Sequence, residues 1–120
     1  MNGGRVETKD VPLDRKKIAE VLLEVRAERE CQHRKWGQQD HDLPNWFLTL
    51  NEVLGEAAKE ANDFTISASD GEEETDAVMK GSLRLVRTRA VQLAAVAVAM
   101  VEGIDRKLNG KGIEKNEVQS

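Results

Sequence analysis

The residue types best suited to chemistry are concentrated between Glu28 and Trp46, in the segment ERECQHRKWGQQDHDLPNW. These nineteen positions hold two Trp, two His, three basic residues and several amides. An indole ring can stack on a nucleobase, while guanidinium and ammonium groups hold phosphate oxygens, and we expect these roles for Trp36, Arg34 and Lys35. Composition alone favours a structural alternative, in which both Trp side chains anchor the core and both His side chains are surface polar groups.

A row of glutamates follows, with its members one helical turn apart: Glu52, Glu56 and Glu60. At 100° per residue, steps of four keep the three side chains within an arc of roughly 80° on one helix face. Clustered carboxylates beside a groove suit Mg²⁺, which prefers oxygen ligands and shares its shell with substrate phosphates. Spacing alone does not indicate a metal site, because such rows are common on solvated helix faces. The same row recurs earlier in the chain, at Glu20, Glu24 and Glu28.

Other motifs of catalysis and metal binding are missing from the sequence. Cys31 lies near His33 and His41, but a structural zinc site usually needs four ligands and no fourth is found. The sequence has no Gly-rich phosphate loop, no nucleophile elbow and no CxxC pair. A net charge of −4 without a basic stripe argues against a nucleic-acid polymer as partner.

Length and composition indicate one small helical domain. The 120 residues fit a single domain, and 39% hydrophobic with 33% charged residues excludes both a disordered chain and a membrane protein. Aromatic residues make up only 3%, and good helix formers are abundant, which favours helices over a β-sandwich. The longest apolar run, Leu93 to Val101, is far shorter than the roughly 20 residues of a membrane span. A polar N-terminal segment and a single Cys indicate a cytoplasmic protein without a signal peptide.

Helix signals predict one domain over 13–108, flanked by flexible tails at 1–12 and 109–120. The first helix follows the N-cap Asp14, runs to about Lys35 and ends before Gly37. Pro44 and Asn45 are start signals for the second helix, which is expected near 45–63. Apolar residues at helical spacing give both helices a core face. These are Ile18, Val21, Leu22 and Val25 in the first, and Trp46, Leu50, Val53, Leu54, Ala57 and Ala61 in the second.

An acidic segment over 65–76 separates the second helix from the third and is expected to be a surface loop. Ser69 and Glu72 could form a capping box within it. The third helix begins between 77 and 83, near a possible break at Gly81, and runs to about Leu108. Its section over 93–101 is apolar all round, as expected of a helix that is buried on several sides.

Three blocks of the chain resemble the MazG-like, all-alpha nucleoside triphosphate pyrophosphohydrolases: ERECQHRKWGQQDH, NWFLTLNEVLGEAAKEA and VQLAAVAVAMVEGIDRKL. The resemblance covers about 18–108, with the three blocks in the family's order. The resemblance implies an all-α fold, a small helical bundle completed by oligomerisation into a homodimer or homotetramer. It also implies Mg²⁺ as cofactor and hydrolysis of a nucleoside triphosphate to the monophosphate and pyrophosphate, and small members of the family occur in bacteria and bacteriophages. The most specific block matches QxxKWGxQxH, at Gln32, Lys35, Trp36, Gly37, Gln39 and His41.

The resemblance further implies which residues would hold the metal and the substrate. The first and third Glu of the family's metal signature correspond to Glu52 and Glu56, which would be catalytic and bind the metal. Glu60 lies one turn beyond as a further ligand, and the second Glu of the signature falls on Val53. Contacts with the nucleotide are expected from six side chains, namely Arg34, Lys35, Trp36, Gln39, Arg89 and Gln92.

Arg89 departs from the family pattern because it stands where the family has a later Glu, and Gln92 stands at the Asp position that follows. A guanidinium beside Glu52 and Glu56 would pair with them and repel a divalent cation. One hypothesis is therefore that an Arg–Glu cluster replaces the metal and binds a nucleotide without hydrolysing it.

Three functions remain open at the level of sequence. The chain is a Mg²⁺-dependent nucleotide pyrophosphohydrolase, a catalytically silent nucleotide-binding protein on the same scaffold, or a structural helical oligomer. Glu73 and Asp76 have the Glu-x-x-Asp spacing of the missing carboxylates, yet they lie in an acidic stretch that is typical of solvated surface.

Overall fold

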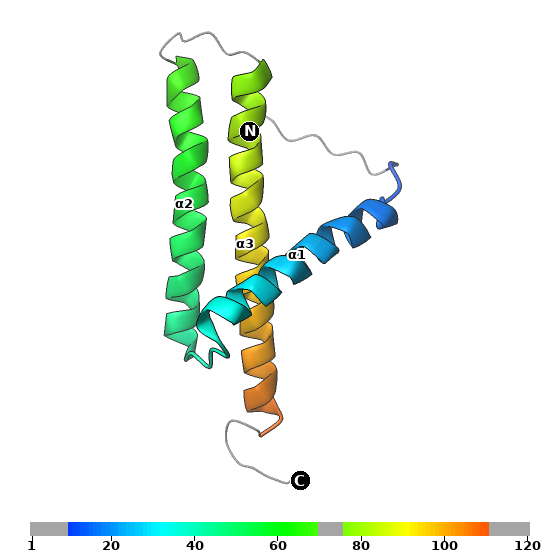
Figure 1. Ribbon diagram of the computed structural model, residues 1–120, viewed down its shortest axis with the longest axis vertical. Coiled ribbons are helices and arrows are strands. Elements are labelled where there is room, and N and C mark those ends of the chain that lie inside the picture. The colour runs from blue at the N-terminus through cyan, green and yellow to red at the C-terminus, as the bar shows by residue number, and fades with distance from the viewer. Residues whose placement is uncertain (1–9, 70–75, 111–120) are drawn as a thin grey trace.

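The computed structural model describes residues 10–69 and 76–110, which form three helices: α1 (Arg15–Trp36), α2 (Leu43–Ser69) and α3 (Asp76–Leu108). No strand occurs in these ranges, and the predicted all-α fold is confirmed. The helices α2 and α3 lie side by side, while α1 crosses α3 obliquely and packs on it (Figure 1). None of the described helices is long and apolar enough to cross a membrane. The predicted tails lie largely outside the described residues.

The limits of α1 follow local signals in the sequence. Asp14 is the N-cap, and its side chain accepts a hydrogen bond from the backbone N–H of Lys17 at 2.9 Å. At the other end, Gly37 has a φ of 70°, a left-handed conformation that favours glycine. Its N–H donates to the carbonyl oxygen of His33 at 2.8 Å and closes the last turn. The predicted start and stop of this helix are confirmed.

The start of α2 depends on Asp42, an N-cap that the sequence analysis does not identify. The Asp42 Oδ1 accepts from the backbone N–H of Asn45 at 3.0 Å. Pro44 occupies the first turn, where its missing N–H leaves no hydrogen bond unmade. The helix therefore begins at Leu43, slightly before the predicted start near residue 45.

The boundary between α2 and α3 differs from the prediction. A surface loop is predicted over 65–76, but α2 continues to Ser69 and α3 begins at Asp76. Residues 65–69 contain neither Gly nor Pro, and an existing helix gains one hydrogen bond for each residue it adds, so it continues through polar residues. α3 also passes through Gly81 without a break, because a single Gly costs a helix only about 1 kcal/mol. The predicted capping box includes Glu72, which lies outside the described residues.

The core lies between α2 and α3 and is centred on Trp46, whose side chain is only 1% exposed. Val96 and Ala99 of α3 are buried against it. Gly103 also faces the indole, since a Cβ built there would lie 3.3 Å from Trp46 Cζ2. The small residues of α3 therefore let α2 approach closely, and Trp46 is a core anchor as the structural alternative expects.

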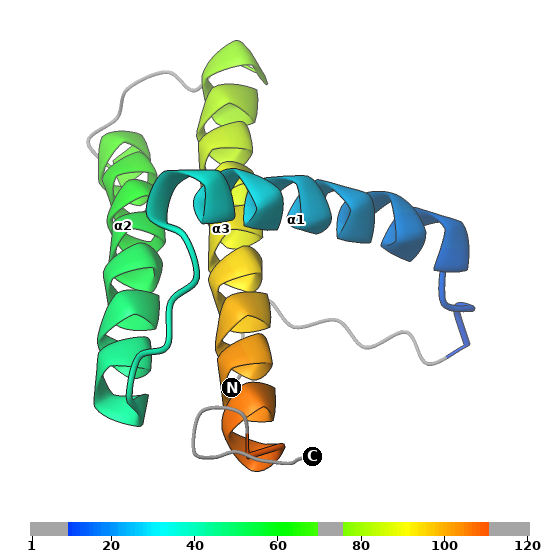
Figure 2. The same cartoon turned by 60° about the horizontal axis from the view of Figure 1, so that its bottom comes forward.

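The predicted core face of α1 is only partly buried. Val25 is buried, but Ile18 and Leu22 are 40% and 59% exposed. The N-terminal half of α1 extends beyond α3 on the side away from α2 (Figures 1 and 2). Because the pattern shows only which face is apolar and not what covers it, the sequence could not separate a core inside this chain from an apolar face left open.

Two glycine substitutions test the packing around Trp46. Gly55 lies in α2 with open space at its Cβ position, so Gly55→Ala should raise the free energy of unfolding by about 0.5–1 kcal/mol through helix propensity. Gly103→Ala gains the same helix propensity, but it places a methyl group 3.3 Å from a buried ring, where overpacking costs about 1–3 kcal/mol. The free energy of unfolding should therefore fall by up to about 2 kcal/mol. Urea unfolding of both variants measures the difference, and equal stabilisation by both would contradict this packing.

Candidate functional site

The described residues form a groove of about 520 Å³ where the last turns of α1 and the connection after it meet α2 and α3. This volume lies within the range of small-molecule sites, roughly 300–1,000 Å³. Four polar residues that the sequence analysis does not assign to substrate or metal also line it, namely Glu28, Gln32, His41 and Thr49. Most of the residues expected to act in chemistry lie here, namely Lys35, Trp36, Gln39, Glu52, Glu56, Arg89 and Gln92.

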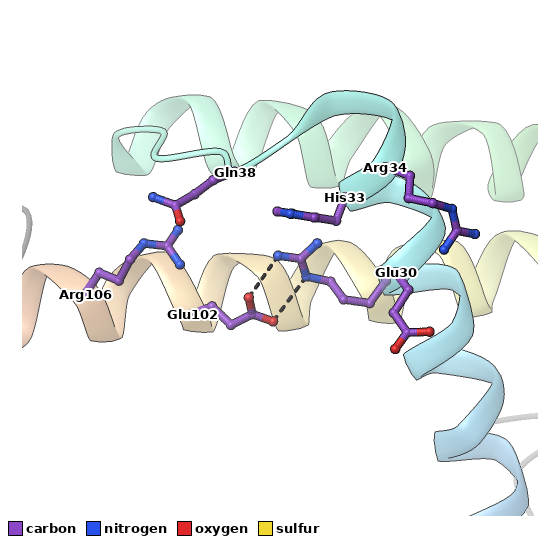
Figure 3. A pocket seen from close by; sticks show the side chains of 7 residues that line it. Glu30, His33, Arg34, Gln38, Glu102 and Arg106 are labelled. Carbon is purple, nitrogen blue, oxygen red and sulfur yellow. Dashed lines mark hydrogen bonds and ion pairs between the residues drawn. The ribbon is translucent and has the colours of Figure 1, made fainter.

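Arg34 does not line this groove, although the sequence predicts that it binds substrate. It lies beside a second hollow of about 420 Å³, between α1 and α3, together with His33, Glu102 and Arg106 (Figure 3). Successive residues of an α-helix point about 100° apart, so α1 turns Lys35 toward the groove and Arg34 away from it. The geometry therefore does not support contact between Arg34 and a ligand in the groove.

Two bidentate arginine–glutamate pairs hold α1 on α3. Arg29 of α1 donates to Glu102 from Nε at 3.1 Å and from Nη2 at 2.8 Å, as the dashed lines in Figure 3 mark. Arg87 of α3 donates to both carboxylate oxygens of Glu24 at 2.7 Å. The hydrogen bonds from Arg87 lower the pKa of Glu24. Each bidentate pair fixes a planar guanidinium against a planar carboxylate. The two pairs therefore orient α1 and the groove residues that it carries.

Arg89 lies among the glutamates of α2. Its Nε is 3.3 Å from both carboxylate oxygens of Glu60, and its Nη1 is 3.5 Å from Glu56 Oε1. The same Nη1 donates to Gln92 Oε1 at 3.1 Å. The guanidinium thus pairs with Glu56 and Glu60, whereas no ion pair joins it to Glu52 in the described part of the chain. Glu60 serves mainly to hold Arg89 and does not itself line the groove.

The carboxylates of the groove fit a metal ion only in part. Within residues 10–69 and 76–110, no three His, Cys, Asp or Glu side chains gather closely enough to hold a metal together. Glu52 and Glu56, one turn apart on α2, both line the groove. Mg²⁺ is often held by one or two carboxylates together with substrate phosphates, so this pair fits a shared ion and not a closed cage. The alternative pair is not tested, because Glu73 and the side chain of Asp76 lie outside the described residues.

The two tryptophans have different environments. Trp36 lines the groove and is 58% exposed, with Lys35 Nζ lying 5.8 Å from the centre of its ring. Trp46 is buried, and the His41 ring meets it edge-on at 4.7 Å between centroids. Trp36 is therefore an exposed aromatic side chain beside the groove, which the structural alternative of two core anchors does not expect.

The connection between α1 and α2 is held against the end of α3. Arg106 donates from Nε to Asp40 Oδ1 at 2.9 Å and from Nη2 to the carbonyl oxygen of Gln39 at 3.3 Å. Asp40 also accepts from Gln38 Nε2 at 2.8 Å. The hydrogen bond from Gln38 and then that from Arg106 lower the pKa of Asp40. These contacts position Gln39 at the groove.

Some of the residues that build the site give no signal in the sequence. Asp40 and Arg106 meet only because the chain folds back, and no local spacing links them. Gln32 is the first residue of the QxxKWGxQxH pattern, and its place in that pattern is the signal by which the sequence could have identified it. Comparisons with protein-family models, curated proteins and solved structures find no match to this chain, and the site is interpreted from its own geometry.

Asp40 gives a prediction about acid stability. Because its pKa is lower in the folded protein than in the unfolded chain, its carboxylate stabilises the fold above about pH 3.8, and this contribution is lost as the pH falls through the folded pKa. Asp40→Asn should therefore reduce stability at pH 7, by at most about 1 kcal/mol for so exposed a pair, and weaken the loss of stability in acid. Arg106→Gln should have the same two effects, a lower stability at pH 7 and a smaller loss of stability in acid. Thermal unfolding between pH 2.5 and 7 measures this, and an unchanged acid limb in Asp40→Asn would contradict it.

Proposed function

We propose that the groove binds a nucleoside triphosphate and that the chain is a MazG-like nucleotide pyrophosphohydrolase, which releases the monophosphate and pyrophosphate. The observation that carries this proposal is the composition of the groove, where an exposed indole, two cations and three carboxylates converge from three helices. The indole, Lys35 and the carboxylates come from the first two of the three sequence blocks that resemble this family, and Arg89 stands two residues before the third. An aromatic face beside cations suits a ligand with a flat base at one end and a charged phosphate chain at the other.

A bound nucleotide gives five side chains of the groove a role in contacting the base or the phosphates. Trp36 stacks on the base, because its ring is exposed beside the groove. Lys35 and Arg89 contact the phosphate oxygens, which favour cationic donors. Gln39 and Gln92 add hydrogen bonds from the connection and from α3.

Glu52 and Glu56 would hold Mg²⁺ together with the phosphates of the substrate. The ion, when bound, neutralises phosphate charge and activates the attacking water. Glu60 assists indirectly, because its ion pair with Arg89 keeps the guanidinium at the edge of the carboxylate row. The proposal thus rests on a metal that the protein and the substrate hold jointly.

A second candidate is a nucleotide-binding protein without turnover, and the ion pairs of Arg89 favour it. The guanidinium lies within 3.5 Å of Glu56 and 3.3 Å of Glu60, so it already neutralises part of the carboxylate row. A fixed cation at this point repels a divalent ion and attracts phosphate. In this case the groove holds its ligand without a metal.

The exposed apolar residues support assembly into a homodimer or homotetramer, which would complete the MazG-like bundle. Few residues are fully buried in the described chain, and a domain this small gains much of its stability by covering apolar surface in an oligomer. A purely structural oligomer is the third candidate. The large apolar side chains that are about half exposed or more include Leu22 and Leu23 of α1, Phe47 and Leu48 of α2, and Leu83 and Val101 of α3.

Pyrophosphate release tests the proposed activity. With Mg²⁺, the protein should release pyrophosphate from at least one member of a panel of canonical and modified nucleoside triphosphates, and EDTA should stop it. Glu56→Ala should lower the rate at least about a hundredfold, because it removes one of two metal-holding carboxylates. Glu20→Ala is the matched control, since Glu20 is an exposed glutamate of α1 outside the groove, and it should keep the rate.

Measurements of nucleotide binding and pyrophosphate release also separate the two alternative functions. A silent binding protein holds nucleotide in EDTA, releases no pyrophosphate and loses affinity in Arg89→Ala. A structural oligomer neither binds nor hydrolyses any nucleotide of the panel. Activity that persists unchanged in Glu56→Ala would contradict the assignment of the metal to this groove.

A further inference from the structure

Gln32 is the one polar side chain that is buried among the described residues, at 6% exposed, and it lines the groove. It lies on α1 one turn after Glu28 and one turn before Trp36. Side chains four residues apart on a helix are neighbours, with Cβ atoms about 5–6 Å apart. Gln32 is therefore placed beside the aromatic ring that the proposal assigns to the base.

The hydrogen bonds of Gln32 fix the orientation of its amide. Its Nε2 donates to Glu28 Oε2 at 3.0 Å and to the backbone carbonyl oxygen of Gln92 at 3.3 Å. Both partners are acceptors, so the NH₂ group must face them and the amide cannot be turned over without losing both bonds. The remaining polar atom, Oε1, has no donor within the described part of the chain.

A buried acceptor without a donor is unfavourable, because it gives up its hydrogen bonds to water. A ligand that supplies a donor removes this cost, and one that lacks the donor does not. Such sites discriminate strongly between ligands that differ by a single N–H or O–H group.

We infer that Gln32 is a specificity-determining residue, whose Oε1 accepts a hydrogen bond from an N–H of the base or an O–H of the sugar. This inference rests on the proposed nucleotide site. Gln92 links the two ends of that site, since its backbone holds Gln32 while its side chain holds Arg89. Gln92 therefore holds both Gln32, the acceptor for the nucleoside, and Arg89, the cation for the phosphates.

Binding of altered nucleotides to wild-type protein and to Gln32→Met tests the inference. Met has a similar length and favours a helix but lacks the amide. The probes are α,β-imido nucleoside triphosphates with Mg²⁺, which resist cleavage. The tightest binder is compared with its 2′-deoxy form, its 3′-deoxy form and a base analogue that lacks one N–H, and inorganic tripolyphosphate reports on the phosphate end alone.

One of the three altered nucleotides should bind wild-type protein about tenfold more weakly than its parent, and this ratio should fall to about one in Gln32→Met. The form that loses affinity identifies the donor as base or sugar. Tripolyphosphate should bind both proteins equally, and a purely structural role of Gln32 would weaken every ligand alike. Unchanged ratios in Gln32→Met, with tripolyphosphate still bound, overturn the inference and leave the proposed function intact. Absence of all binding to folded wild-type protein overturns both.

Discussion

The close packing of Trp46 on α3 is the constraint on which the site depends. The indole is buried against Val96 and Ala99 and lies beside Gly103, and this close contact fixes the register of α2 on α3. Since Trp46 lies in the first turn of α2, its packing sets the position of every later turn of that helix. Glu52 and Glu56 consequently line the groove, and Arg89 comes within reach of the carboxylate row.

The charges of the groove follow from this register. Three glutamates one turn apart would repel one another, and the Arg89 guanidinium offsets that repulsion for two of them. Glu52 is left facing the groove without such a partner in the described residues. The same residue, Arg89, can therefore stabilise the helix pair and present positive charge to a phosphate. This double role is why metal-dependent turnover and metal-free binding are both physically reasonable for one groove.

Local signals allowed part of this structure to be predicted. The limits of α1 depend on Asp14 and Gly37, which act within one turn, and the sequence identifies both. The acidic, Ser-containing composition of 65–76 predicts a loop, but 65–69 contain neither Gly nor Pro to end the helix, so α2 extends through them. Residue types and spacing predict Trp36, Lys35 and the glutamate row as site residues, and the resemblance to a family adds Gln39, Arg89 and Gln92. The choice between Arg34 and Lys35 required the helix orientation. The contact of Asp40 with Arg106 joins distant segments, and no spacing in the sequence predicts it.

The central claim is that a nucleotide binds beside Trp36, and the indole N–H signals in a ¹H–¹⁵N spectrum test it most directly. The chain has two tryptophans, one exposed at the groove and one buried in the core, so each spectrum contains its own internal control. Titration with α,β-imido nucleoside triphosphates should shift the Trp36 signal to saturation and leave the Trp46 signal nearly unchanged. A folded protein in which no nucleotide of the panel moves the Trp36 signal would contradict the account.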